Sequence, residues 1–152
     1  MLTPIVRDDS DPRWQILCDY VVALAEKMGL AAYQIKVCYE PPCTDGAVAQ
    51  VWAKFAVLAA EIAFADSFFT QTQHEQRHIV VHELTHVIDS GRHGCVDLVQ
   101  WEMSPASHTA WYRHYDIERE RVVDWTARLI DPSMPLPDWG EHADTTTDTT
   151  AG

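Results

Sequence analysis

The 152-residue chain is poor in basic residues. It has 11 Lys and Arg against 23 Asp and Glu, which gives a formal net charge of −12. Contacts with nucleic acid phosphates, and docking on anionic lipid surfaces, both need clustered Lys and Arg. We therefore expect a partner that is neither nucleic acid nor a membrane.

The chain also lacks the features of a membrane or secreted protein. It has no apolar run of about 18 residues, the length that a membrane-spanning helix needs. Residues 1–9 lack the basic start, apolar centre and cleavage site of a secretory signal. No CxxC pair is present among its cysteines (Cys18, Cys38, Cys43 and Cys95), so a disulfide scaffold or Cys-based zinc site is not expected. These absences favour a cytoplasmic protein with reduced thiols, of which Cys18 and Cys38 are expected to be buried.

The apolar pattern of the first half predicts one helix followed by short strands. Apolar residues at steps of three and four predict an amphipathic helix over residues 12–28, with Pro at its first position. Alternating apolar residues predict three strands, over residues 32–39, 48–58 and 61–65.

The second half predicts two helices and a tail. Thr72 and Glu75 fit a capping box, and the helix that they begin is expected to end at Ser90-Gly91. Residues 92–104 are expected to form a loop. A last helix is predicted from Ser104-Pro105 or Ser107 to about Ile130, before Asp131-Pro132. Residues 1–132 are expected to form one domain, and the acidic, Thr-rich residues 133–152 a disordered tail.

The predicted second helix contains the sequence His82-Glu83-Leu84-Thr85-His86, an HExxH motif. Residues four apart lie on one face of a helix, so the two imidazoles can converge on one tetrahedral metal ion. Glu83 lies beside that ion and can take a proton from water as a general base. Apolar residues on both sides of the motif predict that the helix is buried, with its polar face on a cleft.

A catalytic zinc site needs a third protein ligand. The spacing of His93 is wrong by one residue for the metzincin pattern, and a distant histidine such as His108 or His114 stays possible. The best candidate is Glu120 in the last helix. Asp124 shares its face and is expected to accept a hydrogen bond from a ligand imidazole. Glu118 is expected to be a solvated charge that pairs with Arg119 or Arg121.

The HExxH motif followed by Glu120-xxx-Asp124 resembles the gluzincin group of zinc metallopeptidases. The segment from Glu120 to Pro132 is similar to one of the ImmA/IrrE-like peptidases, although Val123, Asp124, Thr126 and Asp131 depart from their pattern. That family consists of small cytosolic proteins, common in phages and mobile elements, several of which cleave repressors or trigger their cleavage.

The predicted elements indicate an α+β fold, with a small mixed or antiparallel sheet packed against the motif helix and a C-terminal ligand helix. The resemblance implies that His82, His86 and Glu120 hold one Zn²⁺ ion and that Glu83 is the base for hydrolysis of a protein or peptide substrate. In a phage-encoded protein, the host cytoplasm would be the location. The family's helix-turn-helix partner region is not evident in this chain.

Two other interpretations stay open. The chain could be a metal-binding regulatory module with little turnover, or a structural protein without metal. The sequence does not rank the candidates for stabilising the transition state, which are Tyr112, Tyr115, His108 and His114. His74 and His78 continue the four-residue spacing upstream of the motif and are expected to be solvated.

Overall fold

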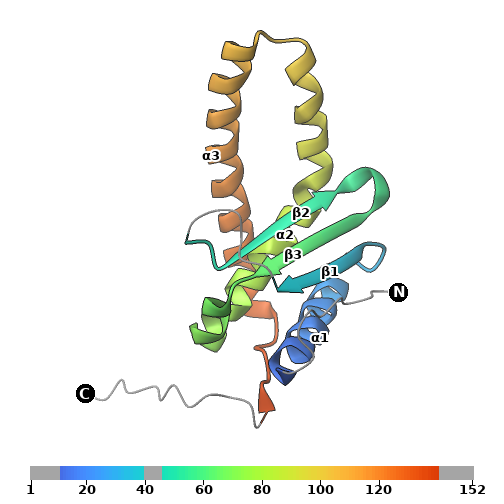
Figure 1. Cartoon of the computed structure of the whole chain (residues 1–152), viewed down its shortest axis with the longest axis vertical. Coiled ribbons are helices and arrows are strands. Elements are labelled where there is room, and N and C mark those ends of the chain that lie inside the picture. Colours follow the sequence, from blue (N-terminus) through green and yellow to red (C-terminus); the bar gives the residue numbers. More distant parts are fainter. Residues whose placement is uncertain (1–10, 40–45, 141–152) are drawn as a thin grey trace, which may run out of the picture.

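The computed structural model describes residues 11–39 and 46–140, and Figure 1 shows their arrangement. Its helices are α1 (Pro12–Lys27), α2 (Gln73–Leu98) and α3 (Pro105–Ile130), and its strands are β1 (Gln34–Tyr39), β2 (Ala49–Lys54) and β3 (Ala59–Phe64).

The strands form one small mixed sheet. β3 lies in the centre, parallel to β1 and antiparallel to β2, so the order is β1-β3-β2 and β2 is an edge strand. Together with the three helices, this sheet confirms the predicted α+β class.

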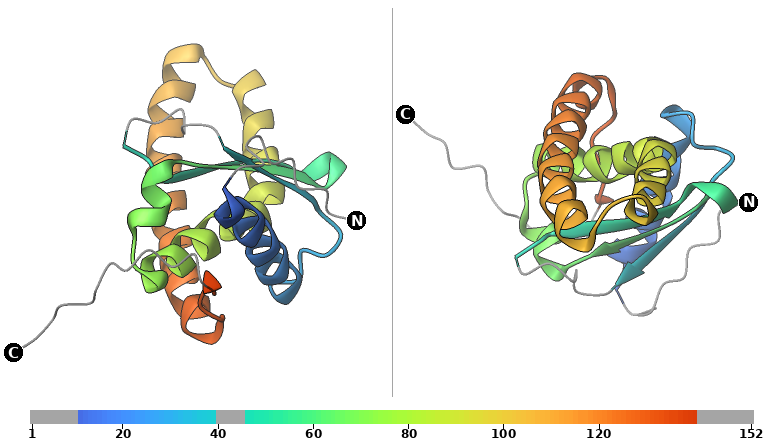
Figure 2. Two further views of the ribbon diagram at one scale, coloured as in Figure 1. Left: turned by 60° about the horizontal axis from the view of Figure 1, so that its bottom comes forward. Right: turned by 90° about the horizontal axis from the view of Figure 1, so that it is seen from above.

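The core lies on one face of the sheet. The register aligns Val37, Ile62 and Val51 across the three strands, and alternation puts their side chains on the same face. Helices α1 and α2 pack their apolar residues against this face, and Ala127 of α3 joins the same core. The view from above in Figure 2 shows the two long helices on one side of the strands.

The predicted strand over residues 48–58 is too long. β2 ends at Lys54, and Phe55–Val57 form a short 3₁₀ turn before Leu58 takes a left-handed conformation with φ 48°. The turn reverses the chain into β3. The apolar alternation continued through this turn, and such alternation does not distinguish an extended strand from a turn at its end.

The prediction of a loop over residues 92–104 is wrong for most of that segment. α2 continues through Gly91 and Gly94 to Leu98 and is followed by a 3₁₀ turn, Val99–Trp101. Contacts from α3 stabilise this extension, since Arg119 bonds to Asp89 and Tyr112 lies beside His93. Tertiary packing therefore overrides the low helix propensity of the glycines. Figure 1 shows α2 and α3 rising together above the sheet.

The predicted tail begins with an ordered segment, so the expectation of disorder is wrong for residues 133–140. Trp139 is buried in the core, and its indole N–H donates to Gln76 Oε1 at 2.8 Å. The Tyr20 hydroxyl donates to the Pro135 carbonyl at 2.8 Å. The missing signal was tertiary, because one tryptophan can anchor a segment that has no periodic pattern. Residues 141–152 lie outside the described part of the chain.

Candidate metal centre

The HExxH motif lies in the middle of α2, where the helix is fixed on both sides. The capping box is present, with Thr72 Oγ1 accepting from the Glu75 backbone and the Glu75 carboxylate accepting from Thr72. The apolar residues around the motif are fully buried: Val80, Val81, Leu84 and Val87. This anchoring sets the rotation of α2 and leaves His82, Glu83 and His86 in a hollow shared with β2 and α3.

One atom each from His82, His86 and Glu120, on α2 and α3, lies close enough to the other two that the group could hold a metal ion. His82 Nε2 and His86 Nε2 lie 3.2 Å apart, and Glu120 Oε2 lies 3.6 Å from the first and 3.4 Å from the second. Ligands bound at about 2.0–2.2 Å at the corners of a tetrahedron are separated by roughly 3.3–3.6 Å. The side chains therefore fit three corners around one zinc ion, with the fourth left for water or substrate.

The electrostatics of the three groups are strongly coupled. Burial opposes charge on His82, but the Glu120 carboxylate beside it raises the pKa of His82 above its usual value. The same histidines hold the pKa of Glu120 far below its usual value. A deprotonated carboxylate facing two imidazoles is the donor set that Zn²⁺ prefers in catalytic sites.

Glu83 has the environment of a general base. Its side chain is buried, and burial raises the pKa of its carboxyl group, an effect that His86 and His82 oppose. No hydrogen bond or ion pair joins Glu83 to any other residue of the described chain, although it lies next to two histidines. A buried carboxylate without a protein partner is costly, so its free oxygens suit a role towards water or a ligand.

The hollow around these groups has a volume of about 450 Å³ and is bounded by three elements. β2 contributes Ala49, Gln50 and Val51, and Ala47 lies two positions before that strand. α2 contributes the motif residues, and α3 contributes Asp116, Arg119 and Glu120. Sites for small ligands or single peptide residues occupy about 300–1,000 Å³. The hollow is therefore large enough for part of a substrate.

The sequence predicted a hydrogen bond from His82 or His86 to Asp124. The structure shows no such bond in the described chain. Its carboxylate lies 3.4 Å from His78 Nε2 and accepts from Arg128 Nε at 2.9 Å. His86 Nδ1 is buried without a hydrogen-bond partner in the described chain. The one-turn spacing correctly placed Asp124 on the same face of α3 as Glu120. The histidine that lies beside it, however, is His78, one turn before His82 on α2.

His78 is not the solvated residue that was expected. It is half-buried, with Nδ1 at 3.6 Å from Asp131 and Nε2 next to Asp124. His78, His82 and Asp124 form a second group whose ligand atoms lie within 4.8 Å of one another. Arg128 already pairs with Asp124, so this second group is less suited to a metal than the first. His74 lies at the first turn, where its Nδ1 is 3.4 Å from Arg77 Nη2.

Glu118 lies outside the centre. Its carboxylate accepts from Arg121 at 2.7 Å, which confirms the predicted surface pair. Glu120, half-exposed at 48%, is the acidic residue of α3 that reaches the histidines.

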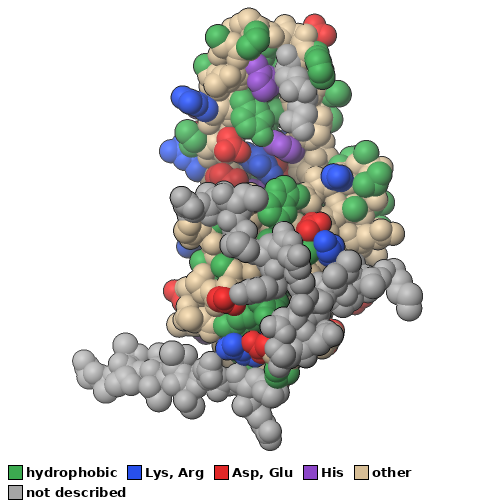
Figure 3. Space-filling view, in the orientation of Figure 1, with side chains coloured by type: hydrophobic (Ala, Val, Ile, Leu, Met, Phe, Trp, Pro, Cys, Tyr) green, Lys and Arg blue, Asp and Glu red, His purple; other side chains and the backbone are tan. Residues whose placement is uncertain are grey.

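The predicted candidates for stabilising the transition state do not line the hollow. Tyr112, Tyr115 and His108 belong to an aromatic cluster with His93 and Trp111, nearer the tips of the two long helices. His114 is exposed. Figure 3 shows histidine side chains at the surface in this upper part of the molecule.

Sequence reasoning missed the two charged residues Asp116 and Arg119, which line the hollow together with unpredicted residues of the β2 region. A signal for Asp116 was available, because it precedes Glu120 by one helical turn and so shares its face. Arg119 had no such signal, since its place depends on Asp89 of the neighbouring helix.

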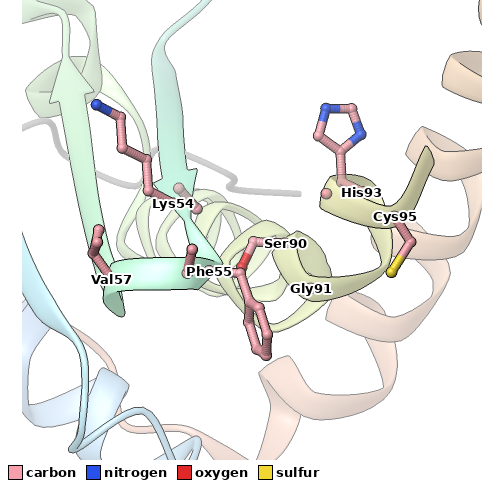
Figure 4. A pocket seen from close by; sticks show the side chains of 10 residues that line it. Lys54, Phe55, Val57, Ser90, Gly91, His93 and Cys95 are labelled. Atoms are coloured by element: carbon pink, nitrogen blue, oxygen red, sulfur yellow. The ribbon is translucent and has the colours of Figure 1, made fainter. Parts of the chain in front are cut away.

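A second hollow lies between the turn after β2 and the extension of α2, and Figure 4 shows its lining. Phe55 contacts Gly91, where an added Cβ would approach the ring to 3.1 Å. His93 and Cys95 line it too, but neither belongs to a group of metal-ligand atoms in the described chain. This hollow shares no lining residue with the metal hollow.

Comparison of the chain with protein families, with curated proteins and with solved structures finds no match. Within the described residues, no helix has the length and apolar character needed to cross a membrane.

Proposed function

We propose that this protein is a zinc-dependent metallopeptidase, with one Zn²⁺ held by His82, His86 and Glu120. The convergence of the three ligand atoms, at separations of 3.2–3.6 Å, carries the proposal. The likeness of the motifs to the gluzincins and the ImmA/IrrE-like peptidases supports it.

The chemistry is hydrolysis of a peptide bond. His82, His86 and Glu120 would hold the zinc ion, which when bound would supply a Lewis acid able to lower the pKa of a water to about 7 and to polarise a carbonyl group. Glu83 accepts a proton from the attacking water while the water oxygen bonds to the carbonyl carbon. When the C–N bond breaks, Glu83 returns that proton to the leaving amine. Its burial and its lack of a protein partner suit both transfers.

A peptide is favoured as substrate because the hollow is bounded by a sheet edge. Within residues 11–39 and 46–140, β2 is an edge strand whose ladder partner is β3. Peptides commonly bind by adding a strand to such an edge. Gln50 and Val51 on β2 lie next to the motif residues around the same hollow, which would bring an added strand close to Glu83.

The alternative is a metal-binding regulatory module with little turnover. The free, buried carboxylate of Glu83 favours the enzyme, because a site that only binds metal has no use for an unpartnered acid. We place the protein in the cytoplasm on the strength of the resemblance and of the free Cys18, Cys38 and Cys95.

The test compares zinc-loaded wild type with Glu83→Gln on a proteome-derived peptide library, with new N-termini identified by mass spectrometry. We expect cleavage by wild type, a loss of at least about 100-fold in the variant, and equal zinc content in both proteins. The cleavage sites would also define the substrate preference. Zinc binding without cleavage would favour the regulatory module, and a wild type that binds no zinc would contradict both.

A further inference from the structure

Arg119 is the one cationic side chain among the residues that line the metal hollow, apart from the two ligand histidines. The sequence offered tyrosines and histidines for stabilising a developing oxyanion, and none of them lies there. Metal ions and cationic side chains both stabilise such a developing charge, and Arg119 is the cationic side chain that α3 brings to this hollow.

The neighbours of Arg119 fix its guanidinium and leave one side of it available. Its Nε donates to Asp89 Oδ2 at 3.3 Å, which ties α3 to α2. Its Nη1 lies 3.8 Å from Asp116 and 4.0 Å from Glu120 Oε1. Nη2 makes no hydrogen bond or ion pair within the described part of the chain, although the side chain is only 16% exposed.

The position relative to Glu120 places the guanidinium beside the centre. Glu120 directs Oε2 to the histidines and Oε1 towards Arg119, so the cation lies one carboxylate away from the ligand atoms. A guanidinium stays charged at any working pH and presents N–H groups in a rigid fork. It can therefore donate to an oxygen that gains negative charge, without losing a proton itself.

We propose that Arg119 is a further catalytic residue, whose N–H groups donate to the carbonyl oxygen of the scissile peptide bond. This role rests on the proposed function. As water adds to the carbonyl carbon, the C=O electron pair moves to the oxygen and Arg119 stabilises the resulting charge. When the carbonyl re-forms, the pair returns and the C–N bond breaks. Asp89 is the positioning residue that holds the guanidinium in place.

The test uses zinc-loaded Arg119→Ala and Arg119→Lys with Arg121→Ala as the matched control, because Arg121 lies two positions away and is 71% exposed. Removing one oxyanion donor costs about 100- to 1,000-fold in kcat. We expect a loss of that size in Arg119→Ala on the peptide library, with KM and zinc content little changed. Arg119→Lys should retain more activity, and Arg121→Ala should match wild type.

Chemical rescue separates a catalytic role from a structural one. Millimolar ethylguanidinium should restore part of the activity of Arg119→Ala and leave Arg121→Ala unaffected. Asp89→Asn, which keeps Arg119 but weakens its anchor, should lose kcat to a smaller extent. The Arg119 role would be overturned if the activity of Arg119→Ala stayed within threefold of wild type. It would also be overturned if the variant lost activity in proportion to its zinc content and ethylguanidinium did not restore it. A zinc-loaded wild type that cleaves nothing would instead contradict the proposed function itself, and the role of Arg119 with it.

Discussion

Replacement of Trp139 tests whether the segment after α3 is part of the fold. The side chain is 6% exposed and packs edge-on against Phe68 and Phe69, with centroid distances of 6.3 and 5.4 Å. Truncating a buried aromatic side chain to Ala costs about 3–5 kcal/mol. We expect Trp139→Ala to lower the free energy of unfolding by that amount. Urea titration followed by circular dichroism measures it.

Trp139→Phe removes the hydrogen bond and part of the buried ring volume. The variant keeps an aromatic ring but leaves Gln76 Oε1 without its donor, and an unsatisfied buried acceptor costs about 1–3 kcal/mol. The matched control is Trp125→Phe, because Trp125 is 65% exposed and surface changes stay within about 0.5 kcal/mol. Losses below about 1 kcal/mol in Trp139→Ala would refute the docking of this segment.

Three further predictions concern the cap, the thiols and the metal. Hydrogen bonds from Thr72 lower the pKa of Glu75 below 4.5. The Glu75 carboxylate therefore stabilises the fold fully above the pKa that Glu75 has in the unfolded chain, and this stabilisation is lost as pH falls through its pKa in the folded protein. Glu75→Ala should therefore destabilise the protein more at pH 7 than at acid pH in the same titration; an equal effect at both would contradict this. Burial raises the pKa of Cys18 and Cys38 to about 11, so iodoacetamide at pH 8 should alkylate the exposed Cys95 well before either, as read by peptide mass spectrometry. Zinc at 100 times its Kd should raise the unfolding free energy by about 2.7 kcal/mol, and EDTA should reverse the shift; a melting temperature unmoved by both would count against the site.

The sequence was most informative where a local rule decides the structure. The capping box at Thr72 and Pro105 at the start of α3 mark helix beginnings through nearest-neighbour chemistry, and both are present. The grouping of His82, His86 and Glu120 was also predictable. Four-residue spacing sets His82 and His86 on one face whatever the rest of the fold does.

What the sequence could not predict depends on contacts between distant elements. α2 continues past Gly91 because α3 packs beside it, and Trp139 is ordered because a site between Phe68 and Gln76 receives it. Asp124 shares a face with Glu120, yet which histidine it meets depends on the offset between two helices. Local spacing does not fix that offset.

The most direct test of the metal centre is the zinc content of purified protein, measured by mass spectrometry. It compares wild type with Glu118→Ala and Glu120→Ala, two variants on the same helix, α3. We predict about one zinc per chain in wild type and in Glu118→Ala, as expected of a catalytic site with three protein ligands, and a strong loss in Glu120→Ala. Wild-type protein without zinc, or a loss in Glu118→Ala while Glu120→Ala keeps its metal, would contradict the assignment.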